Sequence, residues 1–305
     1  MDYEYEHDFF VNDHLFLLWY YLVDVNVDGC GYEIMWRVIT ILTTLNNFIY
    51  MDFLLFDMSS IMNHRKYLFL MGYPGDEVFS CVLLRRLLLA GKEVIVVFVS
   101  SGDAVSKTGV REQEAHRALS VVHLALPKIF FLQVPQREVF SHFTTIINKT
   151  RQLVVRYQID CIVSPDFEGG HEANDSVAFC AAYIASTSGF AYYTFPVYHM
   201  RGGKVVGGRF KPLVSETETI NILSQEKSVK EGFLAAHQSI KNHFEQLQDS
   251  TKDFLPILFS RELYRESPRE NFSKKPCEEV MYEKRSTRVG VFEEFRAACE
   301  KVKRI

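Results

Sequence analysis

The sequence predicts an α/β fold with a Rossmann-like, doubly wound and mainly parallel sheet. Four short segments with apolar centres, residues 67–71, 93–99, 129–134 and 160–164, have the length of strands, and residues 93–99 have the nearly continuous β-branched composition of a strand that is buried on both faces. Segments with apolar residues at helical spacing alternate with these runs, as βαβ units require. The chain has 305 residues, of which 48% are hydrophobic, so it is large enough to bury such a sheet between helices.

The first strand and the loop after it are the most informative stretch. Residues 67–71 lead into Gly-x-Pro-Gly and then into Asp76 and Glu77, and residues 78–90 have helical spacing. The carboxyl ends of parallel strands are where α/β proteins bind ligands, so the two acids mark a candidate site. An acidic first turn also complements the helix dipole, which is a purely structural explanation for the same residues.

The second polar loop, residues 165–175, follows the fourth strand and precedes a predicted helix over 176–188. It contains paired glycines and His171. Because strands one and four of a parallel sheet end at the same rim, Asp76 and His171 are expected to share a cleft. A hydrogen-bonded loop histidine is the alternative interpretation for His171.

The C-terminal part predicts a hairpin, a long helix over residues 225–247 and a closing helix over 292–302. His237 lies in the predicted long helix and is a candidate site residue, with a packed histidine as the alternative. Residues 260–270 alternate in charge, which predicts a solvated surface.

Net charge, a missing motif and the distribution of cysteines argue against several classes of protein. A net charge of -4 gives no basic excess for nucleic acid. The first strand is followed by carboxylates in place of G-x-G-x-x-G, which argues against a nucleotide-dependent Rossmann enzyme. Dispersed cysteines and an acidic N-terminus indicate a cytoplasmic protein with reduced thiols.

The domain organisation is predicted as residues 1–61, an appendage, and residues 62–305, one α/β domain. Polar residues interrupt the apolar run 34–56, so a membrane span is not expected there. The sequence leaves the oligomeric state open.

Taken together, the loops resemble the PIG-L/LmbE family of metal-dependent N-deacetylases over residues 66–238. The family's first motif, His-Pro-Asp-Asp-Glu, corresponds to residues 73–77, Tyr-Pro-Gly-Asp-Glu. Its second motif resembles residues 100–102 together with Arg111 and Glu114. Its last motif resembles residues 168–176, Glu-Gly-Gly-His-Glu-Ala-Asn-Asp-Ser. The resemblance implies hydrolysis of an amide on an N-acetylated sugar or glycoconjugate, with zinc as cofactor.

The chain departs from the family at the positions that carry the chemistry. The resemblance implies zinc ligands at Tyr73, Asp76 and Asn174, of which only Asp76 is a usual metal ligand. The implied catalytic base is Gly75, which has no side chain. His171 matches the family histidine that stabilises the oxyanion or protonates the leaving amine. We therefore expect impaired zinc chemistry, because the remaining oxygen-only set of ligands would hold magnesium, calcium or manganese loosely, or no metal at all.

The candidate site residues follow from this resemblance. His171 and Asp76 are the candidate catalytic residues, and the candidate substrate-binding residues are Tyr73, Arg111, Asn174 and His237. The expected function is a sugar- or amide-binding cleft in a deacetylase fold. The alternative is an active N-deacetylase whose rearranged site recruits another carboxylate, from among Glu77, Asp166, Glu168 and Asp175.

Overall fold

The computed structural model describes residues 60–102, 109–211, 217–250, 252–266, 270–285 and 288–304. The chain divides into two units, Met1–Asp57 and Met58–Ile305, and the described residues belong to the second. The predicted appendage therefore lies outside the described residues, except for Ser60 and Ile61, and the apolar run 34–56 lies wholly outside them. No helix in the described part of the chain is long and apolar enough to cross a membrane.

Within the described residues, seven strands form the central sheet in the order β3-β2-β1-β4-β5-β9-β8. Their bounds are β1 Lys66–Met71, β2 Glu93–Phe98, β3 Ile129–Phe131, β4 Cys161–Pro165, β5 Ala191–Phe195, β8 Glu218–Asn221 and β9 Arg261–Glu266. Strands β1 to β5 pair in parallel, and β9 is antiparallel to both β5 and β8. The predicted doubly wound, mainly parallel sheet is confirmed.

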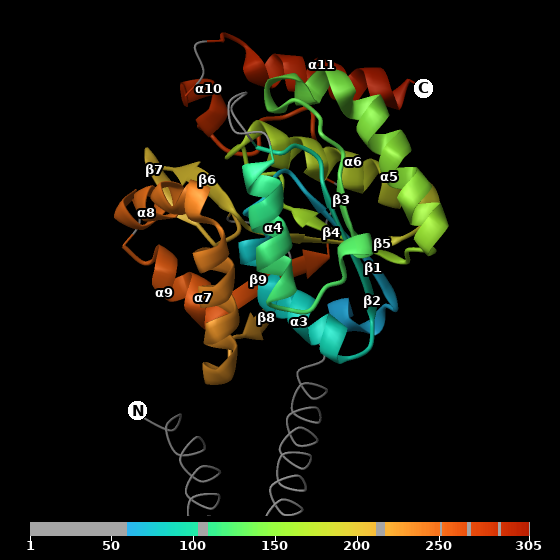
Figure 1. Ribbon diagram of the computed structural model, residues 1–305. Helices are drawn as coiled ribbons and strands as arrows, with labels where there is room; N and C mark the ends of the chain where they lie inside the picture. The colour runs from blue at the N-terminus through green and yellow to red at the C-terminus, as the bar shows by residue number, and fades with distance from the viewer. Residues whose placement is uncertain are drawn as a thin grey trace, which may run out of the picture. The chain divides into compact units, whose positions relative to one another are not determined.

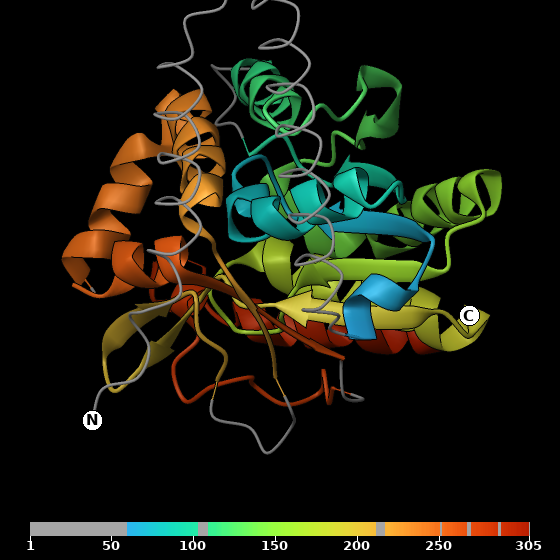
Figure 2. The ribbon, with the colours of Figure 1, turned by 90° about the horizontal axis from the view of Figure 1, so that it is seen from below.

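Helices cover both faces of this sheet (Figures 1 and 2). One layer holds α3 Cys81–Leu89, α4 Val110–Ser120, α7 Lys227–Ala236, α8 Lys241–Ser250 and α9 Phe254–Ser260, and the other holds α5 Phe143–Tyr157, α6 Glu172–Ser188 and α11 Val291–Lys303. Along β1, Tyr67 and Phe69 pack into the first layer, whereas Leu68 and Leu70 pack into the second. A continuous apolar run therefore fills two cores at once.

Shorter elements complete the described fold. They are η1 Ser60–Asn63, η2 Asp76–Phe79, η3 Leu126–Lys128, η4 Gln136–His142, η5 Ser224–Glu226, η6 Gln238–Ile240, α10 Met281–Arg285 and the hairpin strands β6 Tyr198–Arg201 and β7 Lys204–Gly207. Strands β6 and β7 form the predicted hairpin. The preceding strand, β5, belongs to the main sheet and not to the hairpin. Ile61 is fully buried and accepts a hydrogen bond from the Tyr67 hydroxyl, so residues 60 and 61 pack with the domain.

The prediction of one helix over residues 225–247 was wrong. The helical path breaks between α7 and α8, where His237 has non-helical backbone angles and the short helix η6 follows. His237 is fully buried, and its Nε2 lies 2.7 Å from Glu77 Oε1. This bond draws the chain inward at the residue where a straight helix would continue along the surface.

The solvated surface expected for residues 260–270 was wrong in part, because β9 buries two of its charged side chains, whereas Arg261 and Glu266 are exposed. Glu262 and Arg265 are almost completely buried in it. Glu262 pairs with Lys230 at 2.5 Å, and Arg265 donates to both carboxylate oxygens of Asp166 at 2.7 and 2.9 Å. The charges are inside because each has a partner from a distant part of the chain.

Candidate site at the strand ends

A pocket of about 240 Å³ opens at the rim where the sheet's parallel strands end. Its lining residues are Tyr73, Gly102, Arg111, Gln136, His171, Tyr198, Ser239, Ile240 and His243. The sequence-based candidates Tyr73, Arg111 and His171 are thus brought together. In the α7–α8 connection the sequence singled out His237 and not the lining residues Ser239 and Ile240, and the lining residue Tyr198 of the hairpin was missed.

Asp76 lies beneath this pocket and is 1% exposed. Its Oδ2 accepts hydrogen bonds from the backbone N–H groups of Gly72 and Tyr73, at 2.8 and 3.1 Å. Its Oδ1 lies 3.4 Å from Nδ2 of Asn174, which donates to it. Burial raises the pKa of Asp76 to about 7, and the backbone donors only partly oppose this rise.

The residues that the resemblance places at the metal positions do not fit a zinc ion. The Asn174 amide already faces the remaining carboxylate, and the Tyr73 hydroxyl bonds to the Tyr198 hydroxyl at 3.2 Å. Burial also raises the pKa of Tyr73 well above its ordinary value, so this residue is a phenol and a poor ligand. Among the residues that the structure describes, no group of three or more His, Cys, Asp or Glu is placed to hold a metal ion.

Gly75 is the residue that the resemblance places at the position of the catalytic base, and the neighbouring space is filled. Its φ of 114° lies in the left-handed region that favours glycine. A Cβ built on Gly75 would lie 2.3 Å from Cδ1 of Ile240, far inside contact distance. An aspartate there would meet both an unfavourable backbone and the Ile240 side chain.

His171 lies at the N-terminal end of α6 and lines the pocket. Its Nδ1 accepts a hydrogen bond from the Ala173 N–H at 3.1 Å, which makes it the N-cap of the helix. Its Nε2 lies 2.8 Å from the side-chain amide of Gln136, and its ring centroid lies 4.7 Å from that of Tyr73. The capping role anchors the histidine while one edge of the ring stays at the pocket.

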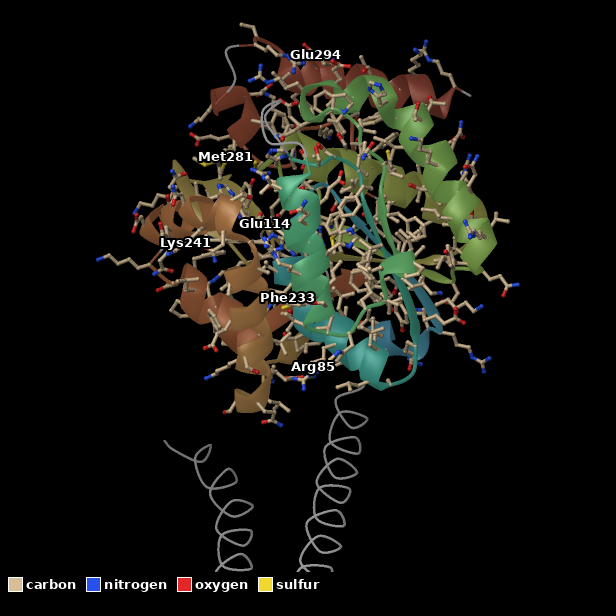
Figure 3. All side chains as sticks on the ribbon, viewed as in Figure 1. Arg85, Glu114, Phe233, Lys241, Met281 and Glu294 are labelled. Atoms are coloured by element: carbon tan, nitrogen blue, oxygen red, sulfur yellow. The ribbon has the colours of Figure 1, made fainter. Side chains whose placement is uncertain are left out.

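His237, a candidate for substrate binding, is not part of the pocket wall. It lies between two buried carboxylates, 2.7 Å from Glu77 Oε1 and 4.0 Å from Glu114 Oε2. Glu114, labelled on α4 in Figure 3, accepts from both the N–H and the hydroxyl of Ser239. This network holds the α7–α8 connection against α4, and it places Ser239 and Ile240 at the pocket instead of His237.

The other carboxylates near the strand ends also have partners away from the pocket. Asp166 pairs with Arg265, and Glu168 accepts from the Val197 N–H at 2.8 Å. Asp175 accepts from two backbone N–H groups of its own loop and from the Tyr282 hydroxyl. None of these three residues lines the pocket. They shape the loops that surround it.

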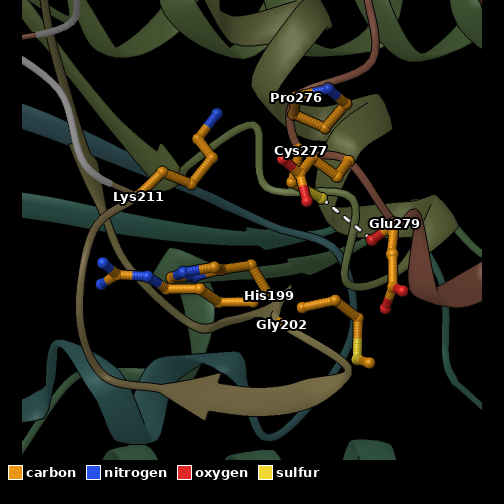
Figure 4. A pocket seen from close by; sticks show the side chains of 9 residues that line it. His199, Gly202, Lys211, Pro276, Cys277 and Glu279 are labelled. Atoms are coloured by element: carbon orange, nitrogen blue, oxygen red, sulfur yellow. Dashed lines mark hydrogen bonds between the residues drawn. The ribbon is translucent and has the colours of Figure 1, made fainter.

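A second pocket, of about 420 Å³, lies between the β6–β7 hairpin and the segment before α10 (Figure 4). The Cys277 thiol in its wall is directed at the Glu279 carbonyl, 3.0 Å away. Burial raises the pKa of Cys277, so the thiol is not activated as a nucleophile. Lys211, also in the wall, donates to the Phe167 carbonyl.

Comparisons with known proteins agree with this architecture. The model of the PIG-L family, described as GlcNAc-PI de-N-acetylase, matches residues 68–185. The zinc-inhibited form of teicoplanin deacetylase Orf2 is similar with a TM-score of 0.50 at 10% identity, over 66% of this chain and 97% of that chain. The A40926 pseudoaglycone deacetylase Dbv21 gives a TM-score of 0.50 at 11% identity, over 68% of this chain and 100% of that chain. No curated protein matches.

At such low identity the solved structures show only that the fold is shared. The match to the family model is a separate observation, and it covers residues 68–185. The strand ends, the loop that carries Asp76 and the loop that carries His171 all fall within that range. Residues 68–185 of the chain are therefore similar to the PIG-L family, whose motifs resemble the loops that carry Asp76 and His171.

Proposed function

We propose that this protein has lost zinc-dependent deacetylation and uses the cleft at its strand ends to bind a small sugar- or amide-type ligand. The observation that carries this proposal is the pair of contacts that replace the catalytic groups. The Asn174 amide donates to Asp76, and the Ile240 side chain fills the space beside Gly75.

Each contact removes a part that amide hydrolysis needs. A positioned general base contributes about 10²- to 10⁴-fold in rate, and at Gly75 there is no side chain to act as one. Asp76 has both carboxylate oxygens engaged and is almost completely buried. The nearby carboxylates Glu77 and Glu168 are held by buried partners and do not line the pocket.

The ligand class is inferred from the family and from the preserved wall. The similar solved structures are named as deacetylases of teicoplanin and of the A40926 pseudoaglycone. The pocket keeps Arg111 and His171 at the positions that resemble the family's second and last motifs. An N-acetylated sugar or glycoconjugate is therefore the first ligand class to test. The unpaired cysteines Cys81, Cys161, Cys180, Cys277 and Cys299 fit a reducing compartment such as the cytoplasm.

The decisive experiment measures metal content and acetate release on the same purified protein. Elemental analysis is expected to find far less than one equivalent of zinc, and N-acetylglucosamine derivatives are expected to release no acetate with or without added zinc. Stoichiometric zinc together with chelator-sensitive release would instead establish the alternative, an active N-deacetylase with a rearranged site.

A matched variant guards against contaminating hydrolases. If acetate release is seen, the Asp76→Asn protein from an identical preparation is assayed beside the parent. Release that persists in this variant comes from another enzyme, whereas release that disappears belongs to this chain and overturns the proposal.

A further inference from the structure

Two residues of the pocket wall, His171 and Gln136, hold each other in one orientation. His171 is the N-cap of α6, and Gln136 is the first residue of η4. Both line the pocket at the strand ends. The position of the proton on the histidine decides which end of the glutamine amide is left for a ligand. This inference rests on the proposed function, because it assumes that the pocket binds a ligand.

The cap of α6 determines which ring nitrogen of His171 carries the proton. The backbone N–H of Ala173 donates to Nδ1 at 3.1 Å, so Nδ1 directs a lone pair at this donor. The direction of this N–H is fixed by the helix. A neutral imidazole has one N–H group and one acceptor nitrogen. The proton of neutral His171 is therefore on Nε2.

The side-chain amide of Gln136 adapts to this proton. Its nitrogen lies 2.8 Å from Nε2 of His171 in this structure. Two N–H groups that face each other at this distance repel. A turn of 180° about the last side-chain bond brings the amide oxygen to the same place without changing the shape of the side chain. Because the capped histidine has no lone pair at Nε2, the bonded form has the amide oxygen of Gln136 accepting from Nε2–H.

Packing holds both partners of this bond in place. The ring centroid of His171 lies 4.7 Å from that of Tyr73. On the other side, η4 is anchored by Val139 and Phe140, which are buried in the core layer that also holds α5 and α6. Within the described residues, the Gln136 side chain has no hydrogen-bond partner other than His171. The NH2 group is thus the end of this amide that is left for a ligand.

We propose that Gln136 recognises a carbonyl oxygen of the ligand through its NH2 group, and that His171 is the positioning residue that orients it. Both acceptors of the pair are engaged, since Nδ1 of His171 bonds to the α6 backbone and the amide oxygen of Gln136 bonds to Nε2–H. A carbonyl oxygen needs donors only, whereas a hydroxyl group also brings a proton that needs an acceptor. His171 acts as a fixed donor to Gln136 and not as an acid or a base, because protonating Nδ1 would break the cap.

Proton–nitrogen correlation NMR spectra of the full chain with isotope-labelled histidine test the orientation at pH 8. The His171 signals are identified as those missing in His171→Asn, whose side chain can still cap α6. An Nε2–H tautomer is expected for His171, and it should persist in Gln136→Leu because the cap sets it. A ring protonated on Nδ1, in the neutral or the charged form, would overturn the proposal.

Isothermal titration calorimetry on the full chain tests the recognition with two sugars. N-acetylglucosamine and glucose differ at one ring carbon, which carries an acetamido group in the first and a hydroxyl group in the second. N-acetylglucosamine is expected to bind at least about 5-fold more tightly, as one neutral hydrogen bond would allow. Gln136→Glu keeps an oxygen toward His171 but has no NH2 group. It is expected to weaken binding of N-acetylglucosamine about 5- to 50-fold and to leave binding of glucose unchanged.

Two further variants separate recognition from support of the fold. Gln136→Leu loses both ends of the amide and should lose the same preference for N-acetylglucosamine. If Gln136 only tied η4 to α6, Gln136→Glu would keep the preference and Gln136→Leu would lose it, which would overturn the proposal. Gln246→Glu introduces the same charge at an exposed residue of α8 outside the pocket, and it should change neither affinity.

The failures of the two proposals can be told apart. Equal affinities of the parent protein for the two sugars, or an equal loss in Gln246→Glu, would overturn the role of Gln136 and leave the binding cleft standing. Affinity for neither sugar would contradict both proposals. Zinc-dependent acetate release would contradict the proposed function alone.

Discussion

Replacing Asp76 with asparagine tests whether the Asp76 carboxylate is a buried structural group or a metal ligand. Asp76 is almost completely buried, and burial raises its pKa from 3.8 to about 7. The folded protein therefore keeps a proton that the unfolded chain releases between these two pH values. The contribution of Asp76 to the free energy of unfolding is thus greatest below about pH 3.8, and it is lost as the pH rises to 7.

The size of the effect follows from the two pKa values. They differ by about 3, and one pKa unit corresponds to about 1.4 kcal/mol, so ionising Asp76 in the folded protein costs about 4 kcal/mol. Asparagine cannot ionise. Its carbonyl oxygen can still accept from the backbone N–H groups of Gly72 and Tyr73. We expect Asp76→Asn to be more stable than the parent at pH 8, by up to about 4 kcal/mol, and close to the parent at pH 4.

Urea denaturation at pH values between 4 and 8 measures this difference directly. Other buried acids, such as Asp175, titrate in both proteins and cancel in the comparison. The exposed residue Asp249 provides a control, because Asp249→Asn should shift stability by no more than about 0.5 kcal/mol at every pH. If Asp76→Asn were less stable than the parent at pH 8, the carboxylate would have to be held by a favourable contact such as a bound cation. That result would refute the reasoning and revive the zinc site.

Three further outcomes are expected in denaturation experiments. Lys230→Met should cost about 3 to 5 kcal/mol, because it leaves Glu262 buried without its ion-pair partner; a loss below 1 kcal/mol would show that the ion pair is not needed to bury Glu262. Gly75→Ala should cost about 2 kcal/mol, and clearly less when Ile240→Ala is already present; equal losses would show that the two side chains do not collide. A chain that begins at residue 62 lacks the buried Ile61 and should lose about 2 to 4 kcal/mol relative to one that begins at residue 58; equal melting curves would place the domain start later.

The central sheet could be predicted because its signal is local. Each of β1, β2 and β4 is a continuous apolar run, and burial on both faces of a parallel sheet requires such a run. The polar loops after β1 and β4 were placed at the same rim by topology alone, and the pocket found there contains Tyr73 and His171. Local pattern and parallel topology were sufficient for the fold and for the position of the site.

The features that could not be predicted depend on partners far apart in the sequence. Strand β9 has the charge pattern of a surface, but Glu262 and Arg265 are buried beside partners from other parts of the chain, among them Lys230 and Asp166. The break before α8 has the same kind of origin, because the residue that draws His237 inward lies 160 positions earlier. A single sequence contains the two members of such a pair but not the information that they meet.

The three substituted positions of the family site are closed by three different contacts. Tyr73 bonds to the hairpin through Tyr198, the space beside Gly75 is filled from η6 by Ile240, and Asn174 bonds to Asp76. Restoring one catalytic side chain would therefore break a contact without rebuilding the site. Because the hairpin and η6 lie outside the matched residues 68–185, the contacts at Tyr73 and Gly75 come from segments beyond the motifs themselves. Under the proposed function, these segments supply wall residues for the ligand in addition to closing the positions that hydrolysis would need.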